Sequence, residues 1–290
     1  MPALMLCFSL ALAHAPLLSP KAVPPAHRPR ALLAPATLAI RFRELLPRLP
    51  PPAPLPAPLS MREEARYAVS YGIIGGIGTL HLSIEGERAD GPRRLITLAG
   101  QGQGGVLGLG RSDKSVSNEF DPAALTSRRW SMARTGGDTV TDVVEQPNAG
   151  VLNMVRQRPG AAPAPLQATF SLPALDPVGL VMRVRVAPPS ADHPLQVLLL
   201  DGQALWRVTL TWAGRQPLPD SERRVSALRV EGRADPIYYN GSDAPDRPRR
   251  TFTLWLSDDD ARVPLRMTMP MGIGDVVVQL VQATRTPRGR

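Results

Sequence analysis

The segment 251–283 reads TFTLWLSDDDARVPLRMTMPMGIGDVVVQLVQA, and its pattern decides the fold. Polar and apolar residues alternate from Thr251 to Ser257, with the period of two that is typical of a strand with two different faces. Three aspartates follow at 258–260, and aspartate favours turns because its side chain bonds the nearby backbone. Extended character resumes over 262–269, and a glycine-containing turn then leads into a valine-rich run at 276–281. The segment is therefore predicted to be a three-stranded antiparallel meander.

Turn signals recur along the rest of the chain between short runs of strand-like residues. The strongest is Asp201-Gly202, which lies between the apolar runs 196–200 and 204–212 and predicts a two-residue hairpin. Helical periodicity is almost absent, and one short helix is predicted over 176–186, because Asp176 before Pro177 suits an N-cap and first turn. The pattern predicts an all-β fold: a curved antiparallel sheet or incomplete barrel with one short helix.

Three stretches of the chain carry a family resemblance. The first contains Trp255, Asp258, Asp259, Arg262 and Pro264, and ends in Gly-Asp-Val-Val-Val; the second is Tyr67-Ala-Val-Ser-Tyr71; the third is Asp201-Gly202 followed by Trp206 to Trp212. Together they resemble the DUF3108 family of bacterial envelope proteins of unknown function, in which they correspond to the C-terminal signature, the opening strand and the central hairpin. The resemblance spans roughly residues 61–284 and supplies no catalytic residues.

Composition sets limits on the class of protein. The 290 residues can hold one large domain or two small ones, and 43% are hydrophobic, which is enough to bury a core. Aromatic residues make up only 4%, so the core must consist mainly of Leu, Val, Ile and Met. The net charge is +9, but residues 1–62 contain seven basic groups and one acid, which leaves +3 for the other 228 residues. We therefore expect no nucleic-acid partner.

The N-terminal region differs in composition from the rest. Residues 1–15 are apolar and end in Ala-His-Ala, which predicts a signal peptide and a location in the periplasm or cell envelope of a Gram-negative bacterium. A lipid-anchored or uncleaved form, with Cys7 as the lipidated residue, and an ordinary disordered start are the alternatives. Residues 16–60 are proline-rich and predict a linker, or alternatively a partner motif. One domain over 61–286 and a tail at 287–290 complete the expected organisation.

No motif predicts catalysis, a metal or a cofactor. Gly100, Gly102 and Gly105 fit G-x-G-x-x-G, but no helix is expected next, so a mobile loop or bulged strand is favoured over a nucleotide site. The aspartates at 258–260 lack the spacing of a calcium loop and indicate a solvated turn. The four histidines form no H-x-x-H pair, and no serine lies in G-x-S-x-G. A non-enzymatic protein without a cofactor is therefore predicted, although a catalytic set built from distant residues stays open.

Apolar strand faces and methionines suggest a hydrophobic site. Met adapts to varied apolar ligands, although a plain core explains the same residues. We predict an apolar groove between the sheet and the helix, lined in part by Leu180, Met182, Met267 and Val278. The first functional hypothesis is binding of a lipid or other hydrophobic envelope molecule, with no integral membrane span after signal removal. The second is a structural or assembly factor that acts through a sheet edge; an enzyme ranks third. Trp255 is predicted to be a packing residue.

Overall fold

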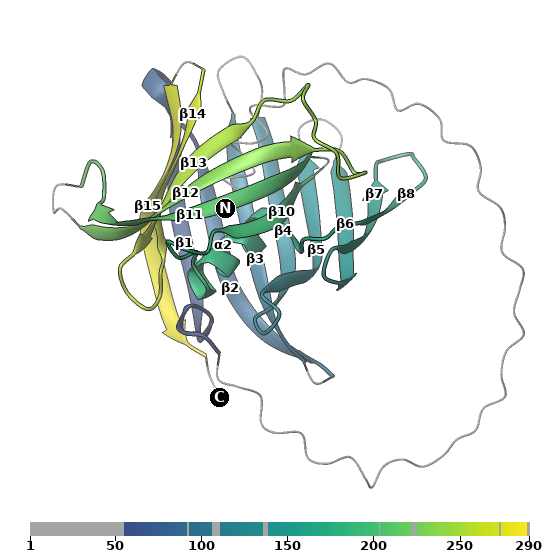
Figure 1. Cartoon of the computed structure of the whole chain (residues 1–290), viewed down its shortest axis with the longest axis horizontal. Helices are drawn as coiled ribbons and strands as arrows, with labels where there is room; N and C mark the ends of the chain where they lie inside the picture. The colour runs from purple at the N-terminus through teal and green to yellow at the C-terminus, as the bar shows by residue number, and fades with distance from the viewer. Residues whose placement is uncertain are drawn as a thin grey trace, which may run out of the picture.

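The computed structural model describes residues 55–91, 93–105, 111–135, 139–202, 204–221, 225–272 and 274–288. Their strands form one sheet of 15 strands in the order β8-β7-β6-β5-β4-β3-β2-β1-β15-β14-β13-β12-β11-β10-β9, and the sheet is not closed into a barrel (Figure 1). The predicted fold class is therefore confirmed. The strands are β1 Met61–Tyr71, β2 Gly75–Asp90, β3 Arg93–Gly105, β4 Arg111–Asp121, β5 Thr126–Thr135, β6 Val140–Asn148, β7 Val151–Gln157, β8 Ala164–Thr169, β9 Ala174–Leu175, β10 Leu195–Asp201, β11 Ala204–Pro217, β12 Ser226–Ile237, β13 Arg250–Ser257, β14 Pro264–Met271 and β15 Gly274–Pro287.

Two long antiparallel meanders make up the sheet. One runs from β1 to β8 and the other from β10 to β15, and β1 joins them by pairing with β15, Met61 opposite Pro287. The predicted C-terminal meander is confirmed as β13, β14 and β15. The sheet is not antiparallel throughout, because the two-residue strand β9 pairs in parallel with β10. The helix that follows β9 connects it to β10 and is the crossover that a parallel pair requires.

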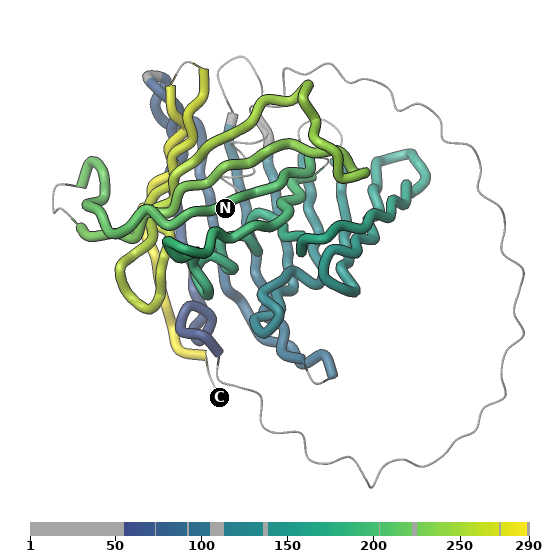
Figure 2. The backbone as a smooth tube through the Cα atoms, in the orientation of Figure 1, coloured from purple at the N-terminus to yellow at the C-terminus, as the bar shows by residue number. Residues whose placement is uncertain are grey.

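The sheet curls until its β9 edge returns to strands β5 and β6. Figures 1 and 2 show β10 to β13 crossing in front of the steeper strands β2 to β6. Gln146 of β6 fastens the β9 edge: its Nε2 donates to the carbonyl oxygens of Ser127 (2.7 Å) and Ala174 (3.1 Å), and its Oε1 accepts from the amide of Ala174 (2.9 Å). Side-chain hydrogen bonds therefore replace a strand ladder where the curled sheet meets itself.

A single α-helix, α2 (Pro177–Val186), is found among the described residues, as the sequence predicts. It lies against β3, β4, β5, β9 and β10 and against the short 3-10 helix η1 (Ala57–Leu59). Eight of its residues are buried, so it packs on all sides, as its nearly continuous apolar sequence requires. Because η1 belongs to this packing and Leu59 is 0% exposed, the packed part of the chain starts before the expected boundary at Met61.

Two further sequence predictions concern the N-terminal region and the glycines of β3. The predicted signal peptide, residues 1–15, and the linker up to residue 54 lie outside the described residues. Gly100, Gly102 and Gly105 all belong to β3, a strand of 13 residues, so the glycine-rich run is neither a loop nor the turn of a nucleotide site. Gly102 pairs with Leu80 on one side and Lys114 on the other, which continues a regular ladder.

Candidate functional site

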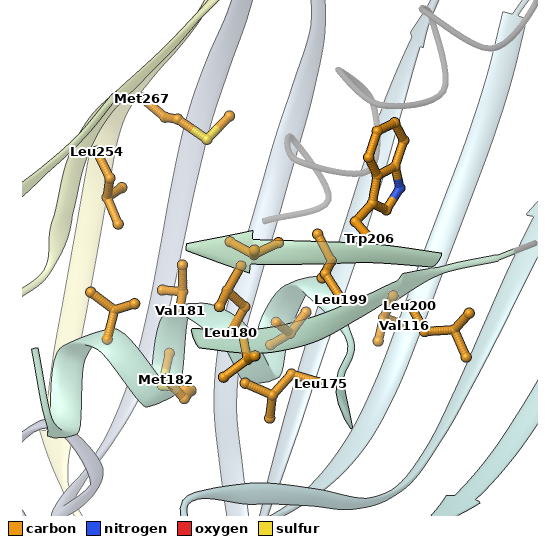
Figure 3. Packing of buried hydrophobic residues seen from close by; sticks show 14 of the residues in the cluster. Val116, Leu175, Leu180, Val181, Met182, Leu199, Leu200, Trp206, Leu254 and Met267 are labelled. Carbon is orange, nitrogen blue, oxygen red and sulfur yellow. The ribbon is translucent and has the colours of Figure 1, made fainter. Parts of the chain in front are cut away.

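The four predicted groove residues share one buried hydrophobic cluster. Leu180 and Met182 come from α2 and are each 1% exposed, while Met267 of β14 and Val278 of β15 are 5% and 3% exposed. Met267 and Val278 are direct cross-strand partners. Figure 3 shows Leu180, Val181 and Met182 on the helix close to Leu199 of β10 and Leu175 of β9, with Met267 farther along the sheet. The structure therefore gathers the four residues in one interior.

The face of the sheet that looks toward α2, here called the inner face, is mostly apolar. It carries alternate residues of the strands because successive side chains point to opposite sides. Its buried members include Ala65, Tyr67 and Val69 of β1, Leu80, Leu82 and Ile84 of β2, Val116 and Phe120 of β4, Trp130 and Met132 of β5, Val208 and Leu210 of β11, and Phe252 and Leu254 of β13.

A buried polar cluster anchors the start of α2. Asp176 accepts from the amides of Val178 (2.9 Å) and Gly179 (3.2 Å) through Oδ1, the hydrogen bonding expected of an N-cap. Its Oδ2 accepts from the hydroxyl of Ser127 (2.8 Å) and from the amide of Asn118, which also donates to Ser127 Oγ. A Cβ at Gly179 would collide with Ser127 Oγ, so glycine lets the helix approach β4 and β5 closely.

Complete burial changes the acidity of this N-cap. Burial raises the pKa of Asp176, and its hydrogen bonds from Ser127, Gly179 and Val178 oppose that rise. Each of these bonds favours the charged carboxylate, whereas removal from water disfavours it, and the burial effect is the larger. The sequence predicted the cap at Asp176 but did not predict Asn118 or Ser127, because polar residues in a strand usually lie on the outer face.

A second buried polar cluster anchors the end of α2. Arg185 is 0% exposed and binds the carboxylate of Glu63 in β1 with both terminal nitrogens, at 2.8 Å and 2.7 Å. Its Nε and Nη2 also donate to the carbonyl oxygen of Ala261, at 3.2 Å and 3.0 Å. Arg262 Nη1 in turn donates to the carbonyl oxygen of Arg185 (2.8 Å). The helix is thus fastened to β1 and to the turn between β13 and β14.

That turn contains most of the residues that carried the family resemblance. Asp259 Oδ1 accepts from Ser257 Oγ (2.6 Å) and from the amides of Ala261 (3.1 Å) and Arg262 (3.0 Å), and these bonds lower its pKa despite opposing desolvation. Asp258 pairs with Arg215 at 3.0 Å. The aspartates therefore shape the turn, which holds Ala261 and Arg262 against the helix end, and no cluster of three His, Cys, Asp or Glu suited to a metal occurs in the described ranges.

The other resemblance residues lie in packing positions. Tyr67 is 3% exposed on the inner face, and burial raises the pKa of its hydroxyl. Tyr71 is partly buried at the end of β1, and Pro264 opens β14, where it pairs with Leu256. Trp255 is 7% exposed, but it alternates with the inner residues Leu254 and Leu256 and so lies on the outer face, opposite Arg229 and Arg266. It is buried outside the main core.

A group of charges, absent from the sequence predictions, lies at one end of the inner face. Asp142 of β6 accepts two hydrogen bonds from Arg156 of β7, at 2.6 Å and 2.9 Å. Asp201, at the tip of the β10–β11 hairpin, is 5% exposed; burial raises its pKa, and Lys114 and Arg134 oppose that rise. Burial correspondingly lowers the pKa of Lys114, and Asp201 opposes that change. The only signal in the sequence was the Asp201-Gly202 turn, which did not indicate where the hairpin tip would dock.

Comparisons with known proteins give a family and no function. Solved structures with some likeness include a β-barrel-like DUF1849 protein from Brucella abortus (12% identity, 78% of this chain and 98% of that one, TM-score 0.49), a candidate lipoprotein from Parabacteroides distasonis (7%, 81% and 100%, 0.32) and LprF from Mycobacterium bovis (14%, 78% and 87%, 0.24). Similarity at this level carries no functional information. A search of curated proteins finds no match.

Among the described residues, no helix is long and apolar enough to span a membrane. The family model for "Protein of unknown function (DUF3108)" matches residues 66–281, which is most of the chain and includes all three stretches that carried the resemblance. The chain therefore belongs to the DUF3108 family.

Proposed function

We propose that this protein is an exported, non-enzymatic envelope protein that binds a lipid or another hydrophobic molecule on the inner face of its sheet. The observation that supports this most is the number of strands in the curled part of the sheet, compared with the one helix that lies against its inner face. The curled part of the sheet runs from β5 through β4, β3, β2, β1 and β15 to β9 and contains twelve strands, and Gln146 joins its two ends. A barrel of about eight strands is just wide enough for side chains to fill, and wider ones enclose ligands or channels.

The inner face has two further properties that suit an apolar ligand. It is lined by aliphatic residues and methionine, and one ten-residue helix lies against it. On β3 the inward positions 100 and 102 are glycines, which contribute no side chain to that part of the wall. Leu180, Met182, Met267 and Val278 are the residues that we expect to contact the apolar part of the ligand.

Ligand extraction tests this proposal directly. Protein purified from a cell-envelope fraction is extracted with organic solvent, and the extract is analysed by mass spectrometry for a co-purifying lipid. Titration with a fluorescent fatty-acid analogue then measures binding, which Val278→Glu should abolish because a buried charge at 3% exposure would face the ligand chain. Circular dichroism establishes whether the variant is folded. An empty extract together with no binding of the analogue would refute the proposal.

The open edge of β8 supports the alternative, a structural or assembly factor. Among the described strands, β8 lies at the end of the sheet and pairs with β7 alone, and its residues are largely exposed, Leu166 at 38%. The strand APLQAT carries no charge, although Pro165 removes one amide donor. An added strand from another protein could pair with this edge. Leu166→Lys should then weaken partner binding while leaving the binding of the fatty-acid analogue unchanged.

A further inference from the structure

The inner face changes from apolar to charged at the end of the interior nearest the β10–β11 hairpin tip. Lys114 of β4 is paired in register with Gly102 of β3 and with Arg134 of β5, so the three positions form one row on the inner face. The next row contains Val116, Met132 and Asp142. The wall beyond it is apolar except for the polar residues that hold the helix start and the β9 edge, Asn118, Ser127 and Gln146. Lys114 is 7% exposed, whereas Arg134 is exposed, so the inner face reaches solvent at this row.

The hairpin tip brings a carboxylate to the same place. Asp201 is 5% exposed, and its Oδ2 accepts no hydrogen bond within the described part of the chain. The tip also approaches the next row, because a Cβ on Gly202 would lie 3.9 Å from Asp142 Oδ2. Asp142 is already bound by Arg156 in a two-fold hydrogen-bonded pair. Asp201 is therefore the carboxylate that faces the row of Lys114 and Arg134.

Within the described part of the chain, two cations of this row, Lys114 and Arg134, face one carboxylate, that of Asp201. The neighbouring Asp142–Arg156 pair adds no net charge. A lysine ammonium has three hydrogen-bond donors and an arginine guanidinium has five. Each can therefore keep its contacts with the protein and still donate to an additional acceptor. An anion here would accept from these donors at a site that is partly removed from water, where such bonds are strong.

We infer that the ligand is an amphiphile with an anionic head group, which binds beside Arg134 and Lys114 while its apolar chain follows the inner face toward Met132 and the helix. This inference rests on the proposed function and specifies its ligand class. The row supplies cationic donors where the interior opens, and the apolar wall begins with Val116 and Met132 in the next row. A carboxylate or phosphate head with a hydrocarbon tail matches both parts of this surface.

The test compares palmitate with hexadecanol, which has the same chain length and no charge. Each displaces a fluorescent fatty-acid analogue from the full-length chain. We expect palmitate to bind about tenfold more tightly than hexadecanol, the effect of one favourable charged contact. Arg134→Gln should remove most of that preference while leaving the affinity for hexadecanol unchanged, and added salt should weaken palmitate binding alone.

Arg129→Gln is the matched control. Arg129 belongs to the same strand, is exposed, and lies on the outer face near Glu145 (3.7 Å), so its substitution should leave both affinities unchanged. Lys114→Met is a second variant that keeps the apolar stem and removes the charge. Because Arg134 is exposed, its variant should fold even if the buried Lys114 variant does not.

The outcomes separate this inference from the proposed function. Equal affinities for palmitate and hexadecanol, or an Arg134→Gln variant with the wild-type preference, would overturn the head-group inference and leave the proposed function standing; the charges would then serve only to dock the hairpin tip. Binding of neither probe would overturn the proposed function. A preference for palmitate that is lost in Arg134→Gln and kept in Arg129→Gln supports both.

Discussion

Arg185→Met should destabilise the protein more than any substitution of a single exposed residue. Met retains much of the apolar stem of Arg185 but removes four hydrogen bonds, two to the carboxylate of Glu63 and two to the carbonyl oxygen of Ala261. The carboxylate would stay at 4% exposure, with Arg285 at 3.2 Å as its remaining cation. Breaking a buried ion pair by removing one partner typically costs about 3–5 kcal/mol.

A double-mutant cycle isolates the pair from the rest of the site. Glu63→Gln removes the charge of the partner, and Arg185→Met in that background no longer leaves a buried carboxylate without its main cation. We therefore expect the double variant to be less destabilised than the sum of the two single variants, with a coupling energy of about 2 kcal/mol or more, as for other residues in direct contact. The remaining loss in the double variant reports the bonds to Ala261.

Urea denaturation followed by circular dichroism measures each free energy of unfolding. A loss of about 3–5 kcal/mol is a large part of the roughly 5–15 kcal/mol that stabilises most domains, so Arg185→Met should unfold at clearly lower urea. Arg183→Met is the control, because Arg183 lies on the same helix and is part-buried, and its side chain bonds the nearby carbonyl oxygen of Ala187 at 2.9 Å and no buried carboxylate of the described chain. Equal stability of the two variants, or a coupling energy near zero, would refute the role of the Glu63 pair.

The remaining predictions concern other parts of the fold. The raised pKa of Asp176 means that the wild type should lose stability relative to Asp176→Asn as the pH rises from 3.8, the ordinary pKa of an aspartate, through the raised pKa. A difference in melting temperature between the two proteins that stays constant across that pH window would contradict this. Trp255→Ala should cost about 3–5 kcal/mol in urea denaturation, and an unchanged midpoint would show that its outer-face packing is unimportant. A chain that starts at Met61 should be less stable than one that starts at Leu55, by about the 2–5 kcal/mol of a buried leucine, because it lacks Leu59; equal melting temperatures would exclude this role.

Features with a local cause were predictable from the sequence. The C-terminal meander follows from alternation between two turns, and the hairpin near Asp201-Gly202 follows from turn chemistry, with Gly202 at positive φ. The predicted turn is shifted by one residue, because Asp201 pairs with Ala204 and so ends β10. The helix also has a local cause, since Asp176 can cap it and Pro177 can begin it. The all-β class then follows from the number of such signals. These elements form by the same short-range rules wherever they occur.

The anchors of the helix were not predictable, because they join residues far apart in the chain. Glu63 and Arg185 are separated by 122 positions, and Asn118 and Asp176 by 58. In the sequence, Glu63 and Asn118 are polar residues within strands, and such residues usually face solvent. Which face they occupy is decided by the sheet register, and only their partners make burial favourable.

The two anchors also show what the family signature does physically. Asp259 fixes the backbone of the turn, the turn presents the carbonyl oxygen of Ala261, and that oxygen accepts two hydrogen bonds from Arg185. The motif therefore holds one end of α2, while Ser127 and Asn118 hold Asp176 at the other. Both ends of the helix are therefore fixed by polar contacts, whereas its middle, which includes the buried Val181, is held by apolar packing in the main core.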